Sequence, residues 1–136
     1  MHSRAGIDQF EERTKQFAID VVWLCTRLED VRGLRQVARQ LSDSAGSVAA
    51  NHRAMRRARS RREFKAKLQI VNEEIDESVL WLEIATAVLD RWRAQPGVVP
   101  PTISMTRDEL SGPLREGGEL RSMFAKARRT ARNRSS

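Results

Sequence analysis

The side chains that most often carry catalysis are scarce in this chain. Its 136 residues include two histidines, His2 and His52, and one cysteine, Cys25. A di-iron four-helix bundle needs a Glu-x-x-His motif on each of two helices, and neither histidine follows a glutamate at that spacing. The sequence also lacks a Gly-rich phosphate loop, an HExxH motif, a CxxC pair and a G-x-S-x-G elbow. We therefore expect no enzymatic activity, no metal and no cofactor.

His52 and Cys25 have simpler structural interpretations. Both fall on apolar stripes of helical spacing. No serine or cysteine pairs with His52 in the sequence as a nucleophile would, and no charge pattern near Cys25 would lower the pKa of its thiol. We expect His52 to be semi-buried and hydrogen-bonded inside the protein, and Cys25 to be a small core residue.

Arginine and lysine are the residues whose spacing predicts a binding surface. The chain carries 25 Lys and Arg against 18 Asp and Glu, a net charge of +7, and this charge is segregated. Residues 51–67 contain one acid, residues 68–90 contain no Lys or Arg, and no acid follows Glu119. Arginine suits phosphate because its planar guanidinium can bind two oxygens at once. The candidate nucleic-acid-binding residues are the cations of the two basic zones: Arg53, Arg56, Arg57, Arg59, Arg61, Arg62, Lys65, Lys67, Arg121, Lys126, Arg128, Arg129, Arg132 and Arg134.

Two interpretations of these cations stay open. Arg53, Arg56 and Arg57 either face nucleic acid or pair with acids of residues 68–90, in the same subunit or in the next. The basic run after Glu119 has fewer acids within reach, which favours a solvated tail that contacts phosphates. No aromatic residues alternate with the arginines, so recognition of backbone or shape is expected instead of base stacking.

Length and composition predict a single all-α domain. A chain of 136 residues can bury a core without disulfides or metal, and 40% hydrophobic residues suffice for one. Tyrosine is absent and aromatic residues make up only 5%, whereas strands favour aromatic and β-branched residues. One cysteine fits a reducing compartment, and the sequence shows neither a run of about 20 apolar residues nor a signal-peptide pattern. We expect a cytoplasmic protein with no membrane partner.

Four segments carry apolar residues at helical spacing, and none alternates as a strand would. The expected helices cover about 9–29, 34–59, 61–94 and 107–131, and a frayed basic tail follows at 132–136. Short links between four helices predict an antiparallel up-down-up-down four-helix bundle.

Local signals predict where the helices begin and turn. Asp8 is the expected start of the first helix, and Gly33 marks the turn after it. Ser60 with Glu63 and Thr106 with Glu109 resemble capping boxes. Val22 is expected to widen the buried stripe of the first helix, and Pro113 to lie near the first turn of the last, where proline is tolerated.

Small residues occupy two expected helices. Residues 42–47 of the second are mostly small, which we interpret as a close helix crossing and not as a break. Gly117 and Gly118 cost roughly 1 kcal/mol each against alanine, so we expect the last helix to be the least stable. The third helix has two apolar faces, the second of which includes Val79 and Trp81, and it is expected to be covered on one side by a partner subunit.

Several short motifs, taken in order, resemble the bacterial four helix bundle protein family, which is also known as the intervening-sequence protein of 23S ribosomal RNA. They include Arg13-Thr14-Lys15 ahead of Phe17-Ala18, and Gln40 to Asn51, which resembles Q-L-x-x-S-x-x-S-x-x-x-N. A third is Ala58-Arg59-Ser60 leading into Glu63-Phe64, and the match covers roughly Arg13 to Leu89. The resemblance implies an antiparallel bundle that assembles into a homo-oligomeric ring, a pentamer, with a basic surface and no established enzymatic activity. A similar bundle serves diversity-generating retroelements by binding a reverse transcriptase and its template RNA.

The resemblance and the charge pattern together give three hypotheses. The first is a non-enzymatic oligomer whose basic surface binds RNA or a ribonucleoprotein. The second is an accessory subunit of a diversity-generating retroelement with a reverse transcriptase as partner. The third is a protein–protein scaffold with no nucleic-acid role. The expected oligomer-interface residues are Asn51, Glu73, Glu77 and Trp81.

Overall fold

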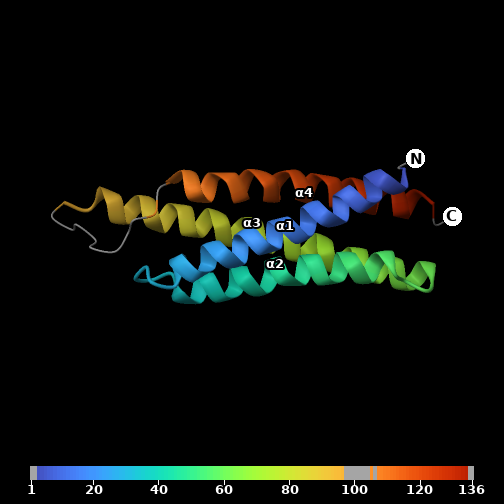
Figure 1. The fold of residues 1–136 in the computed structure, drawn as a ribbon, viewed down its shortest axis with the longest axis horizontal. Coiled ribbons are helices and arrows are strands. Elements are labelled where there is room, and N and C mark those ends of the chain that lie inside the picture. Colours follow the sequence, from blue (N-terminus) through green and yellow to red (C-terminus); the bar gives the residue numbers. More distant parts are fainter. Residues whose placement is uncertain (1–2, 97–104, 106, 135–136) are drawn as a thin grey trace.

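Four helices form the described part of the chain. The computed structural model describes residues 3–96, 105 and 107–134, and none of these residues lies in a β-strand. In chain order the helices are α1 (Arg4–Leu28), α2 (Arg35–Arg56), α3 (Arg61–Ala94) and α4 (Arg107–Asn133). They run alternately up and down along one long axis (Figure 1). The expected all-α class and four-helix bundle are confirmed, and none of these helices is long and apolar enough to cross a membrane.

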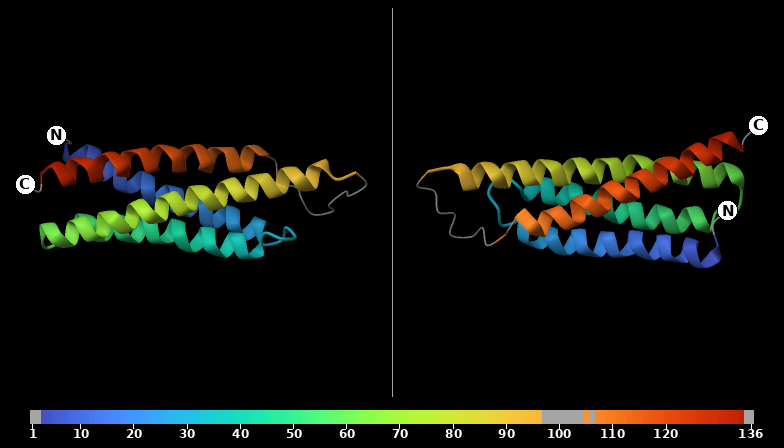
Figure 2. Two further views of the ribbon diagram at one scale, coloured as in Figure 1. Left: turned by 180° about the vertical axis from the view of Figure 1, so that it is seen from behind. Right: turned by 90° about the horizontal axis from the view of Figure 1, so that it is seen from above.

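Neighbours in the bundle follow the order of the chain. Helix α2 packs against α1 and α3, and α4 packs against α3 and α1, so α1 and α3 occupy opposite corners. Figure 2 shows this arrangement from two further sides. Because the helices alternate in direction, the start of α1, the α2–α3 turn and the end of α4 lie at one end of the bundle (Figure 1).

The core is built from one face of each helix, as the apolar spacing predicts. Each large side chain buried there contributes roughly 1.5–3 kcal/mol relative to exposure. Cys25 is buried among them, as expected. The fully buried large side chains are Phe17, Leu28, Leu34, Leu41, His52, Leu68, Ile75, Leu82, Leu89, Leu110, Leu120 and Phe124.

Helix α1 begins earlier than predicted and buries a narrower stripe. Ser3 is its N-cap, because the Ser3 hydroxyl accepts the Gly6 N–H at 3.0 Å; the prediction of a start at Asp8 was wrong. Val22 is 42% exposed, so it does not widen the buried stripe. The turn after α1 contains Gly33 at φ 92°, a conformation that favours glycine, as expected.

The α2–α3 turn shows why α2 ends at Arg56 and not at the predicted residue 59. Residues 57–59 leave the helix so that Ser60, in an extended conformation, can cap α3 by accepting the Glu63 N–H at 3.0 Å. The Glu63 carboxylate in turn accepts the Arg59 N–H at 3.1 Å. The capping interaction predicted from Ser60 and Glu63 is therefore confirmed, and the reciprocal bond reaches one residue earlier than in a standard capping box.

The run of small residues at 42–47 does not interrupt α2, as predicted. At its centre Ser44 is buried, and its hydroxyl lies 2.8 Å from the Ser78 hydroxyl of α3. Ser44 also donates to the Leu41 carbonyl, and Ser78 has the Glu74 carbonyl within 2.9 Å. Small hydroxyl side chains thus let the two helices meet with their polar groups satisfied.

Helix α4 begins where predicted and ends later than predicted. It begins at Arg107, which places Pro113 in its second turn and not near the first, while Thr106 lies outside the described residues. It continues to Asn133, so residues 132 and 133 are helical and not part of a frayed tail; residues 135–136 lie outside the described part.

Gly117 of α4 is buried where α4 crosses two other helices. A Cβ atom at this position would lie 3.2 Å from Cγ2 of Val79 and 3.3 Å from Cε1 of Phe17. A Cβ at Gly118 would have nothing within 4 Å. Gly117 therefore permits a close approach of helices. Gly118 lowers helix propensity and permits no such contact.

Candidate nucleic-acid interface

The two basic zones of the sequence meet at one end of the bundle. Residues 51–67 cover the end of α2, the turn and the start of α3, while the second basic zone covers the end of α4 (Figure 1). The C-terminal ends of α2 and α4 also favour cations through their helix dipoles. We call this surface the cationic end. Its basic residues are Arg53, Arg56, Arg57, Arg59, Arg61, Arg62, Lys65, Lys67, Lys126, Arg128, Arg129, Arg132 and Arg134.

A few cations of the cationic end are held within the chain. Arg56 bridges to α1, with Nη2 2.8 Å from the Asp8 carboxylate and Nη1 3.1 Å from the Glu11 carboxylate. Arg59 lies 3.9 Å from the Glu63 carboxylate and is almost fully exposed, so this pair contributes little. Arg61 donates from Nη2 to the backbone carbonyl of Arg134, the residue after α4, at 2.6 Å.

The other cations of this end have no ion pair with any described residue. An unpaired guanidinium keeps five N–H donors, and an unpaired ammonium three, for an incoming anion. These side chains are Arg53, Arg57, Arg62, Lys65, Lys67, Lys126, Arg128, Arg129, Arg132 and Arg134.

The acids of α3 form few ion pairs with the cations of the cationic end. Asp76 pairs with Arg121 of α4 at 3.2 Å, in an exposed contact, and whether Arg121 also contacts nucleic acid stays a prediction. Glu73 accepts a hydrogen bond from Gln69, and burial together with its acidic neighbours raises the pKa of Glu74. Within the subunit, Arg53, Arg56 and Arg57 therefore make no ion pair with the acids of residues 68–90, and pairing with another subunit stays a prediction.

His52 lies beneath the cationic end as a neutral, hydrogen-bonded residue. Thr14 donates its hydroxyl proton to the Phe10 carbonyl at 2.9 Å, so its oxygen accepts from His52 Nδ1, also at 2.9 Å. The ring stacks edge-on against Phe10 and Phe124, with ring centroids 4.6 and 4.9 Å away. Burial lowers the pKa of His52 to about 4. The expected structural role is confirmed, with burial more complete than predicted.

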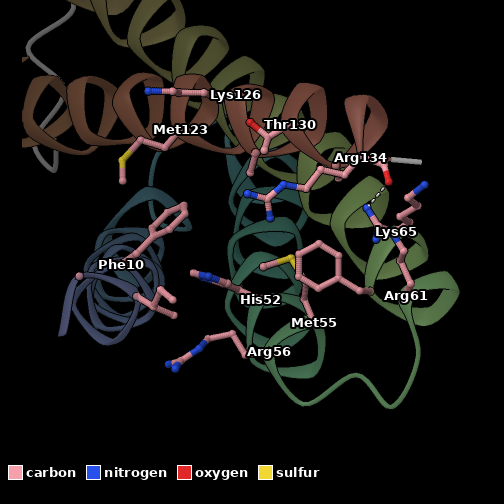
Figure 3. A pocket seen from close by; sticks show the side chains of 15 residues that line it. Phe10, His52, Met55, Arg56, Arg61, Lys65, Met123, Lys126, Thr130 and Arg134 are labelled. Atoms are coloured by element: carbon pink, nitrogen blue, oxygen red, sulfur yellow. Dashed lines mark hydrogen bonds between the residues drawn. The ribbon is translucent and has the colours of Figure 1, made fainter. Parts of the chain in front are cut away.

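A cavity opens at the cationic end between all four helices. It has a volume of about 640 Å³ and is walled chiefly by apolar side chains, including Phe10, Met55, Phe64 and Met123. Five cations and no acid line it, and Figure 3 shows the Arg134 side chain reaching across it from the end of α4. The lining cations are Arg56, Arg61, Lys65, Lys126 and Arg134.

Cys25 and the potential metal ligands of the described residues are not grouped into a reactive site. Burial raises the pKa of the Cys25 thiol to about 12, so the reactive thiolate is disfavoured. Among residues 3–96, 105 and 107–134, no three His, Cys, Asp or Glu side chains come together as metal ligands would. The arrangement offers fixed positive charge and an apolar cavity.

The residues expected at a subunit interface have intrachain roles. Asn51 donates to the Ser47 carbonyl and hydroxyl within α2, and Trp81 Nε1 donates to the Glu77 carboxylate at 3.1 Å within α3. Trp81 also packs against the core. Whether these residues and Glu73 contact another subunit stays a prediction.

Four of the five exposed large apolar side chains of the described residues lie away from the cavity, and the fifth, Ile7, lines it. Trp23 of α1 is 74% exposed, and Ile19 and Val22 form one patch with it at helical spacing. Leu80 of α3 is 50% exposed on the opposite corner of the bundle. The exposure of these residues could have been predicted from the sequence, because each lies one position away from a residue of the stripe that faces the core.

Sequence reasoning also missed the polar groups that join α1 to its neighbours. Arg13 donates from Nε to Glu116 at 3.1 Å and from Nη2 to Glu119 at 2.9 Å, across the α1–α4 contact. The hydrogen bond from Arg13 lowers the pKa of Glu116. Thr14, the next residue, binds His52. The pair Arg13-Thr14 therefore fixes α1 to two other helices.

Comparison with known proteins supports the fold. No protein-family model and no curated protein matches the chain. A solved structure of a protein of unknown function from the S23 ribosomal protein family, from Bacteroides thetaiotaomicron, has a TM-score of 0.70. At 22% identity the match covers 88% of this chain and 97% of that one. The similarity shows a shared four-helix arrangement over nearly the whole of both chains.

Proposed function

We propose that the protein is a non-enzymatic, oligomeric bundle that binds RNA or a ribonucleoprotein through its cationic end. The observation that carries the proposal is the meeting of two basic zones, distant in the sequence, whose cations are mostly unpaired. Arginine and lysine side chains of this kind bind phosphate oxygens and give little sequence specificity. The S23 ribosomal protein family of the solved neighbour is compatible with an RNA partner.

A matched pair of charge reversals tests the RNA proposal. Arg128→Glu/Arg132→Glu reverses two unpaired arginines one turn apart at the cationic end, and Arg35→Glu/Arg39→Glu reverses two at the opposite end of the bundle. Fluorescence anisotropy with a structured RNA should show at least tenfold weaker binding for the first variant and a much smaller change for the second. The log–log salt slope of the first variant should also fall by about one for each phosphate that it no longer neutralises.

The same experiment separates the scaffold alternative. If Arg128 and Arg132 serve ion pairs between subunits, the first variant loses its assembly, which light scattering detects, and the RNA result carries no weight. Equal RNA binding by both variants, with assembly intact, would contradict the proposal.

We further propose that the oligomer is a closed ring built from two different apolar patches. Trp23 with its α1 neighbours and Leu80 of α3 face outward from opposite corners, so a contact between them joins unlike surfaces. Contacts between unlike surfaces build rings when the rotation closes. The assembled mass should be a multiple of the 15.5 kDa chain, five times for a pentamer.

Complementation between two broken interfaces tests the ring. Trp23→Asp and Leu80→Asp should each give monomers by light scattering, because each removes one of the two patches. A mixture of the two variants keeps one intact Trp23 patch and one intact Leu80 patch, and should form a dimer that cannot grow. An α1–α1 interface would instead leave Leu80→Asp fully assembled, and this result would overturn the ring geometry.

A further inference from the structure

We propose that the cavity at the cationic end binds one molecule of a single-chain amphiphilic anion, such as a fatty carboxylate. Its apolar tail would lie between the four helices and its headgroup at the cationic rim. This inference goes beyond RNA binding, because it concerns the interior of this end and not its outer surface.

The walls of the cavity suit an apolar chain. Phe10, Met55, Phe64 and Met123, one from each helix, line it. The Phe10 and Met55 side chains point toward its interior in Figure 3. Methionine side chains adapt to a flexible ligand because they are unbranched and polarizable. An apolar chain in this space would shield side chains that the bundle leaves only partly packed.

The rim of the cavity selects the sign of the headgroup. All charged residues in the lining are cations, and Lys65, Lys126 and the Arg134 side chain have no ion pair among the described residues. Arg134 reaches across the cavity (Figure 3), so its guanidinium can meet a carboxylate at the opening. This rim would repel a cationic headgroup, and a neutral headgroup would gain less from it than an anionic one.

The size of the cavity favours a small molecule over a protein segment. Its 640 Å³ lies within the range of about 300–1,000 Å³ typical of small-molecule sites. Two turns of an α-helix, a cylinder about 10 Å wide and 11 Å long, would need roughly 850 Å³. We therefore assign a monomeric amphiphile as the occupant, and a peptide or a second copy of the chain is an outcome that the test can reveal.

Isothermal titration calorimetry with sodium dodecanoate, kept below its micelle concentration, tests the proposal on the whole chain. We expect saturable binding of one molecule per chain. Each methylene added in the series from octanoate to dodecanoate should lower the Kd about fourfold. Dodecyltrimethylammonium, which has the same chain and the opposite charge, should bind at least tenfold more weakly.

Three variants locate the site. Ala131→Trp fills the cavity from α4 and should abolish binding, while Arg134→Ala should weaken it about tenfold. Arg129→Ala, an exposed cation that does not line the cavity, is the matched control and should bind as the unchanged protein does. Circular dichroism checks that each variant is folded, and Ala127→Trp gives a second cavity-filling change if Ala131→Trp is not.

Four results would overturn the proposal. Equal binding of the ammonium amphiphile removes the role of the rim, and unchanged binding by a folded Ala131→Trp or Ala127→Trp protein removes the cavity. Binding of many molecules per chain indicates nonspecific detergent action. A change in assembled mass on filling the cavity, measured by light scattering, would identify it as a contact between copies. RNA binding is measured separately, so a failure here leaves that proposal standing.

Discussion

Replacing each of two adjacent glycines of α4 by alanine separates helix propensity from packing. Both positions are helical, so the change should stabilise each by up to about 1 kcal/mol from propensity alone. At Gly118 the new methyl group enters open space, and the full gain should appear. At Gly117 it would lie 3.2 Å from Cγ2 of Val79 and 3.3 Å from the Phe17 ring, closer than van der Waals contact.

The crowding at Gly117 should outweigh the gain in propensity. Overpacking of a tight core site typically costs about 1–3 kcal/mol, which leaves Gly117→Ala between neutral and about 2 kcal/mol destabilised. The two variants should therefore differ by about 1–3 kcal/mol. For a chain of this size, each kcal/mol moves the melting temperature by roughly 3–4 °C.

Urea denaturation at one fixed protein concentration measures the difference, since assembly would make apparent stability depend on concentration. Val79→Ala should relieve the crowding, so Gly117→Ala should be better tolerated in that background than in the unchanged protein. If Gly117→Ala stabilised the protein as much as Gly118→Ala, the close approach of α1, α3 and α4 at this glycine would be refuted.

Three further changes test the polar contacts of α1. Burial lowers the pKa of His52 from 6.5 to about 4. As the pH falls, His52 is therefore protonated in the unfolded chain before it is protonated in the folded one. Its contribution to the free energy of unfolding should be present above about pH 6.5 and roughly 2 kcal/mol smaller at pH 5. Denaturation curves of His52→Gln should lack this part of the pH dependence. Thr14→Val leaves the His52 Nδ1–H without its acceptor and should lower the free energy of unfolding, measured by urea denaturation, by about 1–3 kcal/mol. Thr14→Ser keeps the hydroxyl and is the control. An equally large loss of stability in Thr14→Ser would argue against the hydrogen bond. Arg13→Lys removes the forked interaction with Glu116 and Glu119 and should lower the free energy of unfolding by no more than about 1 kcal/mol, because these side chains are partly exposed. The loss of stability should be smaller in 1 M salt. A loss that does not depend on salt would contradict an ionic origin.

The sequence predicts most of the fold because the apolar residues of long amphipathic helices recur at the helical period. Leu41, Ile75, Leu82, Leu110 and Phe124 all fall on predicted stripes and are fully buried. Helix ends are harder, since they depend on single capping contacts that compete with one another. Asp8 and Ser3 are both good caps, and the structure uses Ser3, whose hydroxyl accepts the Gly6 N–H.

The candidate site was predictable in its composition and not in its shape. The two basic zones were visible as blocks, and the up-down order of four helices suffices to bring them to one end. Which cations are neutralised depends on side-chain reach. Arg56 finds Asp8 and Glu11 on a neighbouring helix, and no spacing rule connects residues so far apart in the chain. The cavity is lined by the ends of four helices, and the periodicity of the sequence does not predict how much space they leave between them.

The position of the two chain ends has a practical consequence. The start of α1 and the end of α4 both lie at the cationic end (Figure 1). Any peptide joined to either terminus, including an affinity tag, a fluorescent label or a tethered domain, would emerge beside the proposed RNA surface and the mouth of the cavity. An acidic tag there would compete with an anionic ligand for the arginine and lysine side chains of this end. The turn at Gly33 lies at the far end of the bundle, so an insertion there offers an attachment point that leaves both proposed sites open.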